Sequence, residues 1–185
     1  MNVNIPLFIG GGGEGYTVFG QDLTDAVEPY VRRRPGGGNF FTHREDGRVK
    51  GAVRATHDAG KPVILIGHSW GGSDAIGIAR WARGEELGVD LLMTIDPVGQ
   101  PRALTWSMEA YRGIARHWVT VIAHKPGIQP GDVVAHGWGK TPMAIQSLAN
   151  RVIQDANAGH ADFATMMRTA NAEGLIANAY RARRR

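Results

Sequence analysis

A short apolar segment that runs into a serine flanked by glycines is the feature that most constrains the fold of this chain. Residues 62–72 read PVILIGHSWGG, which places Ser69 between Gly67 and Gly71. The apolar run predicts a buried strand and the residues from about Trp70 predict a helix, so Ser69 lies in the sharp turn between them. Small residues are required two positions before and after the serine because strand and helix nearly touch there. Such a turn holds the serine hydroxyl out above a sheet, where it is available as a nucleophile.

Composition limits the remaining possibilities. The 185 residues fit one domain, expected over residues 1–185 with a basic tail at 181–185, and the chain is 43% hydrophobic and 21% charged, as is ordinary for a globular protein. The absence of cysteine excludes disulfides, thiol chemistry and cysteine-ligated metals. No apolar run approaches the roughly 18 residues of a membrane span. Residues 1–6 lack the basic region of a signal peptide, so we expect the cytoplasm, with export by a signal-less route left open.

The basic excess gathers in two clusters at residues 32–34 and 181–185, within a formal net charge of +4. A surface for nucleic acid or an anionic membrane is one interpretation of these clusters. A solvated helix end and a frayed tail is the other, and we favour it because neither cluster is interleaved with aromatic residues. We therefore expect no nucleic-acid partner.

Apolar strands alternate with helical stretches along the chain. This alternation, with the nearly continuous apolar runs at 63–66 and 91–95, predicts a three-layer α/β fold with a mostly parallel sheet and helices on both faces. In such sheets ligands bind at the loops that leave the carboxyl ends of the strands. The predicted strands cover residues 3–9, 39–43, 63–66, 91–95 and 118–123, and the predicted helices cover 21–34, 48–59, 70–83 and a stretch from 141 onward.

An aspartate stands at the end of the strand that follows the serine unit. Asp96 comes directly after residues 91–95 and precedes a proline. A carboxylate there can accept the Nδ1–H of a histidine, although an Asp-Pro pair also opens turns. Its place after Ser69 fits the chain order nucleophile, acid, histidine. Asp132 serves equally by order, but we favour Asp96 because it lies immediately at a strand end.

Seven histidines compete for the role of general base. Chain order removes those before or beside the serine and those at the two ends of strand 118–123, namely His43, His57, His68, His117 and His124. His160 follows a glycine in a turn expected between two helical stretches, which suits a base carried on a loop. His136 is the fallback, and either histidine could be an ordinary surface residue. His68 is expected to pack behind the serine.

A glycine-rich loop at residues 10–15 follows the first predicted strand. Glycines let a backbone approach a substrate carbonyl, so we expect an N–H of Gly11 or Gly12, with that of Trp70, to stabilise an oxyanion. The loop also satisfies GxGxxG, but no acid ends a strand about 20 residues later and no Gly-Lys-Ser/Thr follows. A plain glycine turn is the remaining alternative.

Other candidate sites are weaker. The chain has no HExxH motif and no close group of histidines and carboxylates on one helix face, so we expect no metal and no cofactor. Large apolar side chains could line an acyl pocket, but packing in the core or on the surface is favoured. These side chains are Trp106, Trp138, Met143, Met166 and Met167.

Three motifs together resemble the α/β-hydrolase superfamily. GHSWGG at 67–72 resembles the GHSxGG motif of its lipases and thioesterases, and TIDPVG at 94–99 looks like the strand-end Asp-Pro motif of the neutral lipase and phospholipase branch. FIGGG at 8–12 is similar to the oxyanion strand and loop of small bacterial lipase-like hydrolases, some of which are secretion-system effectors. The resemblance supports Asp96 over Asp132. It covers about the first hundred residues, beyond which only His160 matches.

Two departures from the family pattern shape the expectation. Gly10 stands where a histidine usually precedes the oxyanion glycine, and the chain is shorter than typical members. We therefore expect a minimal lid or none, and an open site closer to that of cutinase-like esterases than of interfacially gated lipases.

These residues predict a serine esterase or lipase that cleaves a small-molecule or lipid ester. Ser69 would form an acyl-enzyme, His160 would transfer protons and Asp96 would orient His160. A thioesterase or an acyltransferase would use the same residues, and a catalytically silent binding protein or a nucleotide-binding protein are alternatives of other classes. The acyl chain, the alcohol and the oligomeric state stay open.

Overall fold

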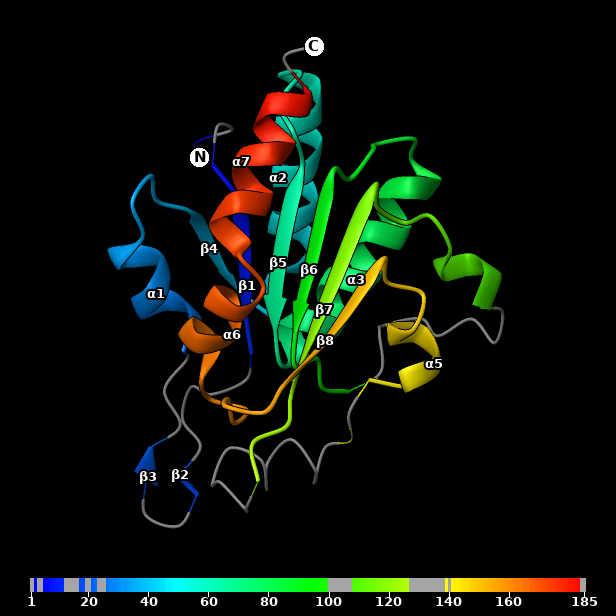
Figure 1. Ribbon diagram of the computed structural model, residues 1–185. Coiled ribbons are helices and arrows are strands. Elements are labelled where there is room, and N and C mark those ends of the chain that lie inside the picture. The colour runs from blue at the N-terminus through cyan, green and yellow to red at the C-terminus, as the bar shows by residue number, and fades with distance from the viewer. Residues whose placement is uncertain are drawn as a thin grey trace.

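A six-stranded sheet forms the centre of the protein (Figure 1). The computed structural model describes residues 2, 5–11, 17–18, 21–22, 26–99, 108–126, 139 and 141–183, with side chains left out at 17–18 and 21–22. The strand order is β4-β1-β5-β6-β7-β8, and every pairing in this sheet is parallel. The strands are β1 (Leu7–Gly10), β4 (Asn39–Thr42), β5 (Ile64–His68), β6 (Leu91–Ile95), β7 (His117–Ala123) and β8 (Arg151–Asp155). A separate antiparallel pair contains β2 (Thr17–Val18) and β3 (Gln21–Asp22).

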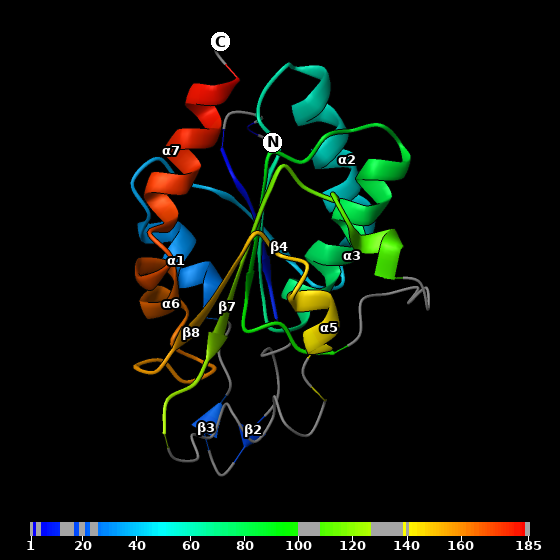
Figure 2. The ribbon, with the colours of Figure 1, turned by 45° about the vertical axis from the view of Figure 1, so that its right-hand side comes forward.

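Helices cover both faces of the sheet (Figure 2). One face carries α2 (Asp46–Asp58), α3 (Trp70–Gly84), α5 (Met143–Gln146) and the 3-10 helix η1 (Met108–Tyr111). The other carries α1 (Val27–Arg33), α6 (Phe163–Thr169) and α7 (Ala172–Ala182). The predicted three-layer α/β fold with a parallel sheet is confirmed.

Alternate side chains of each inner strand enter opposite cores. Leu65 of β5 packs toward α2 and α3, whereas Ile64 and Ile66 pack toward α1, α6 and α7. Successive side chains of a strand point to opposite faces, so a strand buried on both faces is apolar at nearly every position. This burial explains the nearly continuous apolar runs of β5 and β6.

The structure corrects two predicted helices. The helix predicted over 21–34 begins only at Val27, and Gln21–Asp22 forms β3 instead. The helical stretch predicted from 141 onward is interrupted by β8, so His160 follows a strand and does not lie between two helices. β8 is an edge strand whose first residues are largely exposed, and it therefore lacks the continuous apolar run that revealed β5 and β6.

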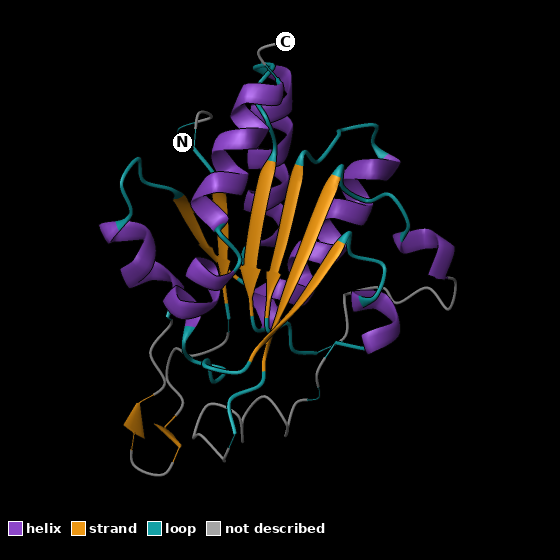
Figure 3. Ribbon diagram, viewed as in Figure 1, coloured by secondary structure: helices purple, strands orange, loops and turns teal. Residues whose placement is uncertain are grey.

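The carboxyl ends of all six sheet strands meet at one edge (Figure 3). Several predictions concern residues outside the described ranges, namely Gly12, Trp106, Asp132, His136 and Trp138. In the described part of the chain, no helix combines the length and apolar character needed to cross a membrane.

Candidate active site

Ser69 occupies the turn between β5 and α3 with its backbone in an unusual conformation. Its φ is 55° and its ψ is −126°, a region that residues with a Cβ rarely adopt. Two glycines make the turn possible. A Cβ at Gly67 would overlap the carbonyl of Gly71, and a Cβ at Gly71 would overlap the carbonyls of Ile9 and Gly10. The glycines flanking Ser69 are therefore required by the close approach of β1, β5 and α3.

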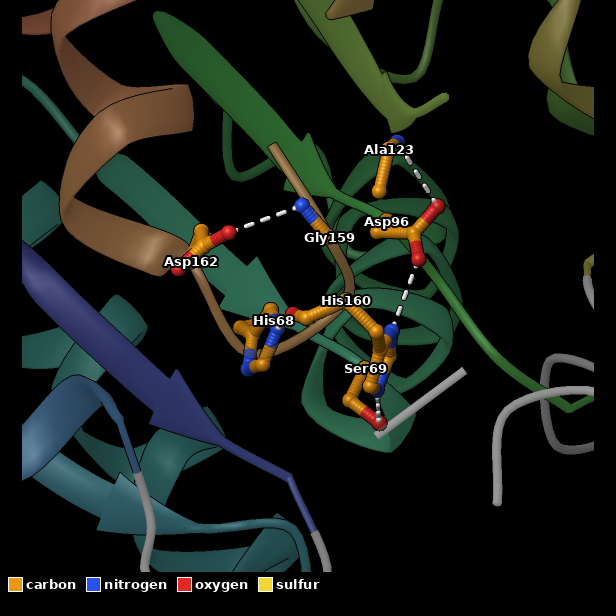
Figure 4. Close-up of polar contacts among 7 residues, drawn as sticks. All are labelled: His68, Ser69, Asp96, Ala123, Gly159, His160 and Asp162. Atoms are coloured by element: carbon orange, nitrogen blue, oxygen red, sulfur yellow. Dashed lines mark hydrogen bonds and ion pairs between the residues drawn. The ribbon is translucent and has the colours of Figure 1, made fainter. Parts of the chain in front are cut away.

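Ser69, His160 and Asp96 form a continuous line of hydrogen bonds (Figure 4). The Ser69 Oγ lies 3.0 Å from His160 Nε2, and His160 Nδ1 lies 2.7 Å from Asp96 Oδ2. A carboxylate only accepts hydrogen bonds, so Nδ1 carries the proton and Nε2 of the neutral ring is left to accept the Ser69 hydroxyl. In this arrangement His160 can take the proton of Ser69 as it attacks an electrophile.

Asp96 is held by the neighbouring strand β7. Its side chain is 1% exposed, and its second oxygen accepts a hydrogen bond of 3.1 Å from the backbone N–H of Ala123. Its own N–H donates to the carbonyl of Val121 at 2.7 Å, and its φ is 38°. The end of β7 therefore fixes the carboxylate that β6 presents.

His68 lies directly before Ser69 and contacts the backbone of His160. Its Nε2–H donates to the His160 carbonyl at 2.8 Å, and its ring packs against Phe163 with the centroids 5.4 Å apart. Burial lowers the pKa of His68 to about 3, and the neighbouring His160 contributes to the same shift. His68 is therefore uncharged at neutral pH. Its ring lies away from the Ser69 hydroxyl (Figure 4).

The predicted oxyanion donors lie beside Ser69. Gly11 is so close that a Cβ there would stand 2.6 Å from the Ser69 Cβ and 3.1 Å from its Oγ. Trp70 is the first residue of α3, and its N–H belongs to the amino end of a 15-residue helix, where the helix dipole favours negative charge. Gly11 and Trp70 thus flank the serine from two different elements.

The indole of Trp70 lies close to residues that follow two strands of the sheet. His43 follows β4, and its ring centroid lies 5.1 Å from that of Trp70. Gly99 lies in the loop after β6, where a Cβ would stand 3.3 Å from Trp70 Cδ1. Sequence reasoning set His43 aside as a base and missed this position. Its place at the end of the predicted strand 39–43, at the edge of the sheet where ligands bind, was the available signal.

A chain of hydrogen bonds holds the loop that follows Asp96. The Thr141 Oγ1 donates to the carbonyl of Gly99 at 2.9 Å, and the Thr141 N–H donates to that of Pro97 at 3.0 Å. Gln146 Nε2 then donates to the Thr141 carbonyl at 2.6 Å, and its Oε1 accepts from Thr120 Oγ1 at 3.2 Å. The loop that follows Asp96 is thereby tied to β7 and α5.

The methionines suggested for an acyl pocket lie elsewhere. Met166 and Met167 are 0% and 1% exposed and belong to the core on the α6 face, as the core interpretation predicted. Met143 is 52% exposed at the start of α5. Among the described residues, no group of three or more histidines and carboxylates is placed to hold a metal ion.

No protein-family model and no curated protein sequence matches the chain. Among solved structures, the NocB thioesterase domain in covalent complex with a fluorophosphonate nocardicin G analogue is similar, with a TM-score of 0.49 and 16% identity over 91% of this chain and 96% of that chain. TT1662 from Thermus thermophilus has a TM-score of 0.49 and 16% identity over 94% and 89%. EstE1, a carboxylesterase cloned from a metagenomic library, has a TM-score of 0.46 and 16% identity over 97% and 80%. Similarity at this level does not assign an activity to the chain.

Proposed function

We propose that this protein is a serine hydrolase of the α/β-hydrolase type that cleaves a carboxylic ester through an acyl-enzyme. The single observation that carries the proposal is the hydrogen-bonded line from the Ser69 Oγ through the His160 ring to the Asp96 carboxylate. Three residues from three separate loops converge on one edge of the sheet. They follow the chain order nucleophile, acid, base, and the hydrogen bonds between them can pass the serine proton to the histidine, as nucleophilic catalysis requires.

Acylation follows from this geometry. The Ser69 Oγ attacks the acyl carbon while His160 Nε2 accepts the hydroxyl proton, and Asp96 stabilises the imidazolium that forms. His160 then returns the proton to the departing alkoxide, so that the C–O bond of the ester breaks and an alcohol leaves. The N–H groups of Trp70 and Gly11 are the proposed donors to the oxyanion, and losing one such donor costs about 3 kcal/mol of barrier in comparable enzymes.

Deacylation uses the same residues in reverse. Water gives its proton to His160 Nε2 as its oxygen attacks the acyl carbon, and His160 then protonates the Ser69 Oγ as the acid is released.

Labelling with a fluorophosphonate probe tests the proposal. The parent protein should be labelled on the peptide that contains Ser69, and Ser69→Ala and His160→Ala should lose the label, because one removes the nucleophile and the other its base. Ser147→Ala and His124→Ala are matched controls, because both residues are exposed, and both variants should label like the parent. Labelling of Ser69→Ala at the parent level would refute the proposal.

A further inference from the structure

His68 and Ser69 are adjacent in the chain, and they contact the backbone and the side chain of His160, respectively. Ser69 contacts the ring of His160 through its Oγ, and His68 donates to the backbone carbonyl of His160 (Figure 4). The end of β5 therefore provides both the proposed nucleophile and a second contact to the residue that would activate it.

Two hydrogen bonds between Gly159 and Asp162 stabilise the turn that carries His160. Gly159 N–H donates to Asp162 Oδ2 at 2.8 Å (Figure 4). Asp162 N–H donates back to the Gly159 carbonyl at 3.0 Å. These bonds shape the turn between β8 and α6 but do not connect it to the strand that bears Ser69. The hydrogen bond from His68, at 2.8 Å, makes that connection.

Packing supports the same contact. The His68 ring lies close to two other rings: that of His160, with centroids 5.0 Å apart and planes at 30°, and that of Phe163, at 5.4 Å. Phe163 is the first residue of α6 and is 1% exposed. A buried imidazole in this position can keep its Nε2–H directed at only one acceptor, because rotation would drive the ring into its neighbours.

We infer that His68 is a positioning residue: its Nε2–H holds the His160 backbone at the distance from Ser69 that proton transfer requires. This inference rests on the proposed hydrolase function. It assigns to the histidine before the serine a role beyond packing, because a phenyl ring would fill the same space without holding the carbonyl. It also accounts for an uncharged histidine there, because a second positive charge 5.0 Å from His160 would oppose the imidazolium formed during catalysis.

Three variants separate the hydrogen bond from the packing. His68→Phe keeps a ring but has no donor, His68→Gln keeps a side-chain N–H that can reach the carbonyl, and Phe163→Leu removes a packing ring while leaving His68 in place. Each is assayed for kcat and KM with a p-nitrophenyl ester and for the rate of fluorophosphonate labelling.

We expect His68→Phe to lower kcat and the labelling rate by about 10- to 100-fold, the effect of a misplacement of up to about 1 Å, with KM changed by less than about threefold. His68→Gln should recover most of kcat, and Phe163→Leu should lose less than about threefold if its fold is intact. Where His68→Phe does not fold, His68→Met is the donor-free variant to compare with His68→Gln.

Parent rates in the donor-free variant would overturn the inference, and so would an equal loss in His68→Gln or in Phe163→Leu. Failure of the proposed function gives a different result. In that case the parent protein itself is not labelled on Ser69.

Discussion

At the scale of single residues, the site concentrates unfavourable backbone geometry. Ser69 and Asp96 both have positive φ, 55° and 38°, and each stands directly after an inner strand of the sheet. Such conformations cost about 1–3 kcal/mol each and persist only where surrounding contacts impose them. Here the contacts are backbone hydrogen bonds from neighbouring strands, which turn both side chains toward His160.

Asp96 is predicted to be the acid of the site. Asp96→Asn should lower turnover by roughly 10⁴, because an amide in place of the carboxylate favours the wrong tautomer of His160. The measurement is kcat on a p-nitrophenyl ester, with a thermal melt to establish that the variant is folded. Asp132→Asn is the matched control and should keep parent turnover. The opposite pattern would make Asp132 the acid.

His68 is predicted to make stability depend on pH. Burial holds its folded pKa at about 3, against an ordinary value of 6.5, so between these values the unfolded chain binds a proton that the folded chain does not. The contribution of His68 to the free energy of unfolding is fully present above pH 6.5. It is lost as the pH falls toward 3, with a limiting slope of about 1.4 kcal/mol per pH unit. The charged or titratable groups that shift the pKa of His68 are His160 and Asp96.

Urea unfolding at several pH values between about 7 and 4.5 measures this slope. His68→Gln cannot titrate, so its unfolding free energy should fall less steeply with acid than that of the parent. Equal slopes in the two proteins would show that His68 does not carry the effect.

At the scale of elements, the central strands and the edge strand β4 were predictable, and the other edge strand, β8, was not. β6 has the predicted bounds, and β5 and β7 differ from theirs by a few residues at most, because burial on both faces favours a largely apolar run. β8 pairs on one side only and exposes Arg151 and Val152, so its sequence carries no such run. The turn at Ser69 was predictable because its glycines act over a few residues of local chain.

The close packing of β1, β5 and α3 leaves no space for a side chain at Gly71. Gly71→Ala would drive a Cβ into the carbonyls of Ile9 and Gly10, which should cost at least about 1–3 kcal/mol and displace the turn at Ser69. Gly84 is the last residue of the same helix, and a Cβ there would meet no atom within 4 Å, so Gly84→Ala should be neutral or stabilise by up to about 1 kcal/mol. Thermal denaturation compares the two, and equal melting temperatures would refute the packing argument.

At the scale of the whole molecule, the site joins residues far apart in the chain. Ser69 and His160 are separated by 91 positions and Asp96 and His160 by 64. No local pattern contains such a contact. Chain order nevertheless reduced the candidates for the base to His136 and His160, because each strand of a parallel sheet delivers its following loop to the same edge. What sequence reasoning could not supply was the contact of His68 with His160, which depends on the path of the turn between β8 and α6.

Amide hydrogen exchange should reflect the order of the strands. β5 and β6 are paired on both sides and buried, so their amides should open only with global unfolding, whereas β8 should exchange earlier. β7, which lies between β6 and β8, provides the internal reference. Exchange at residues 151–155 as slow as at 64–68 would contradict this gradient of stability.

The left-handed backbone at Ser69 has a consequence for how this sequence can change. Glycine adopts that conformation without steric cost, so replacing Ser69 by glycine would relax the turn while removing the hydroxyl. Selection for a durable fold alone would favour that exchange, and selection for chemistry would oppose it. At this position the stability of the fold and the proposed chemistry therefore favour different residues, glycine and serine.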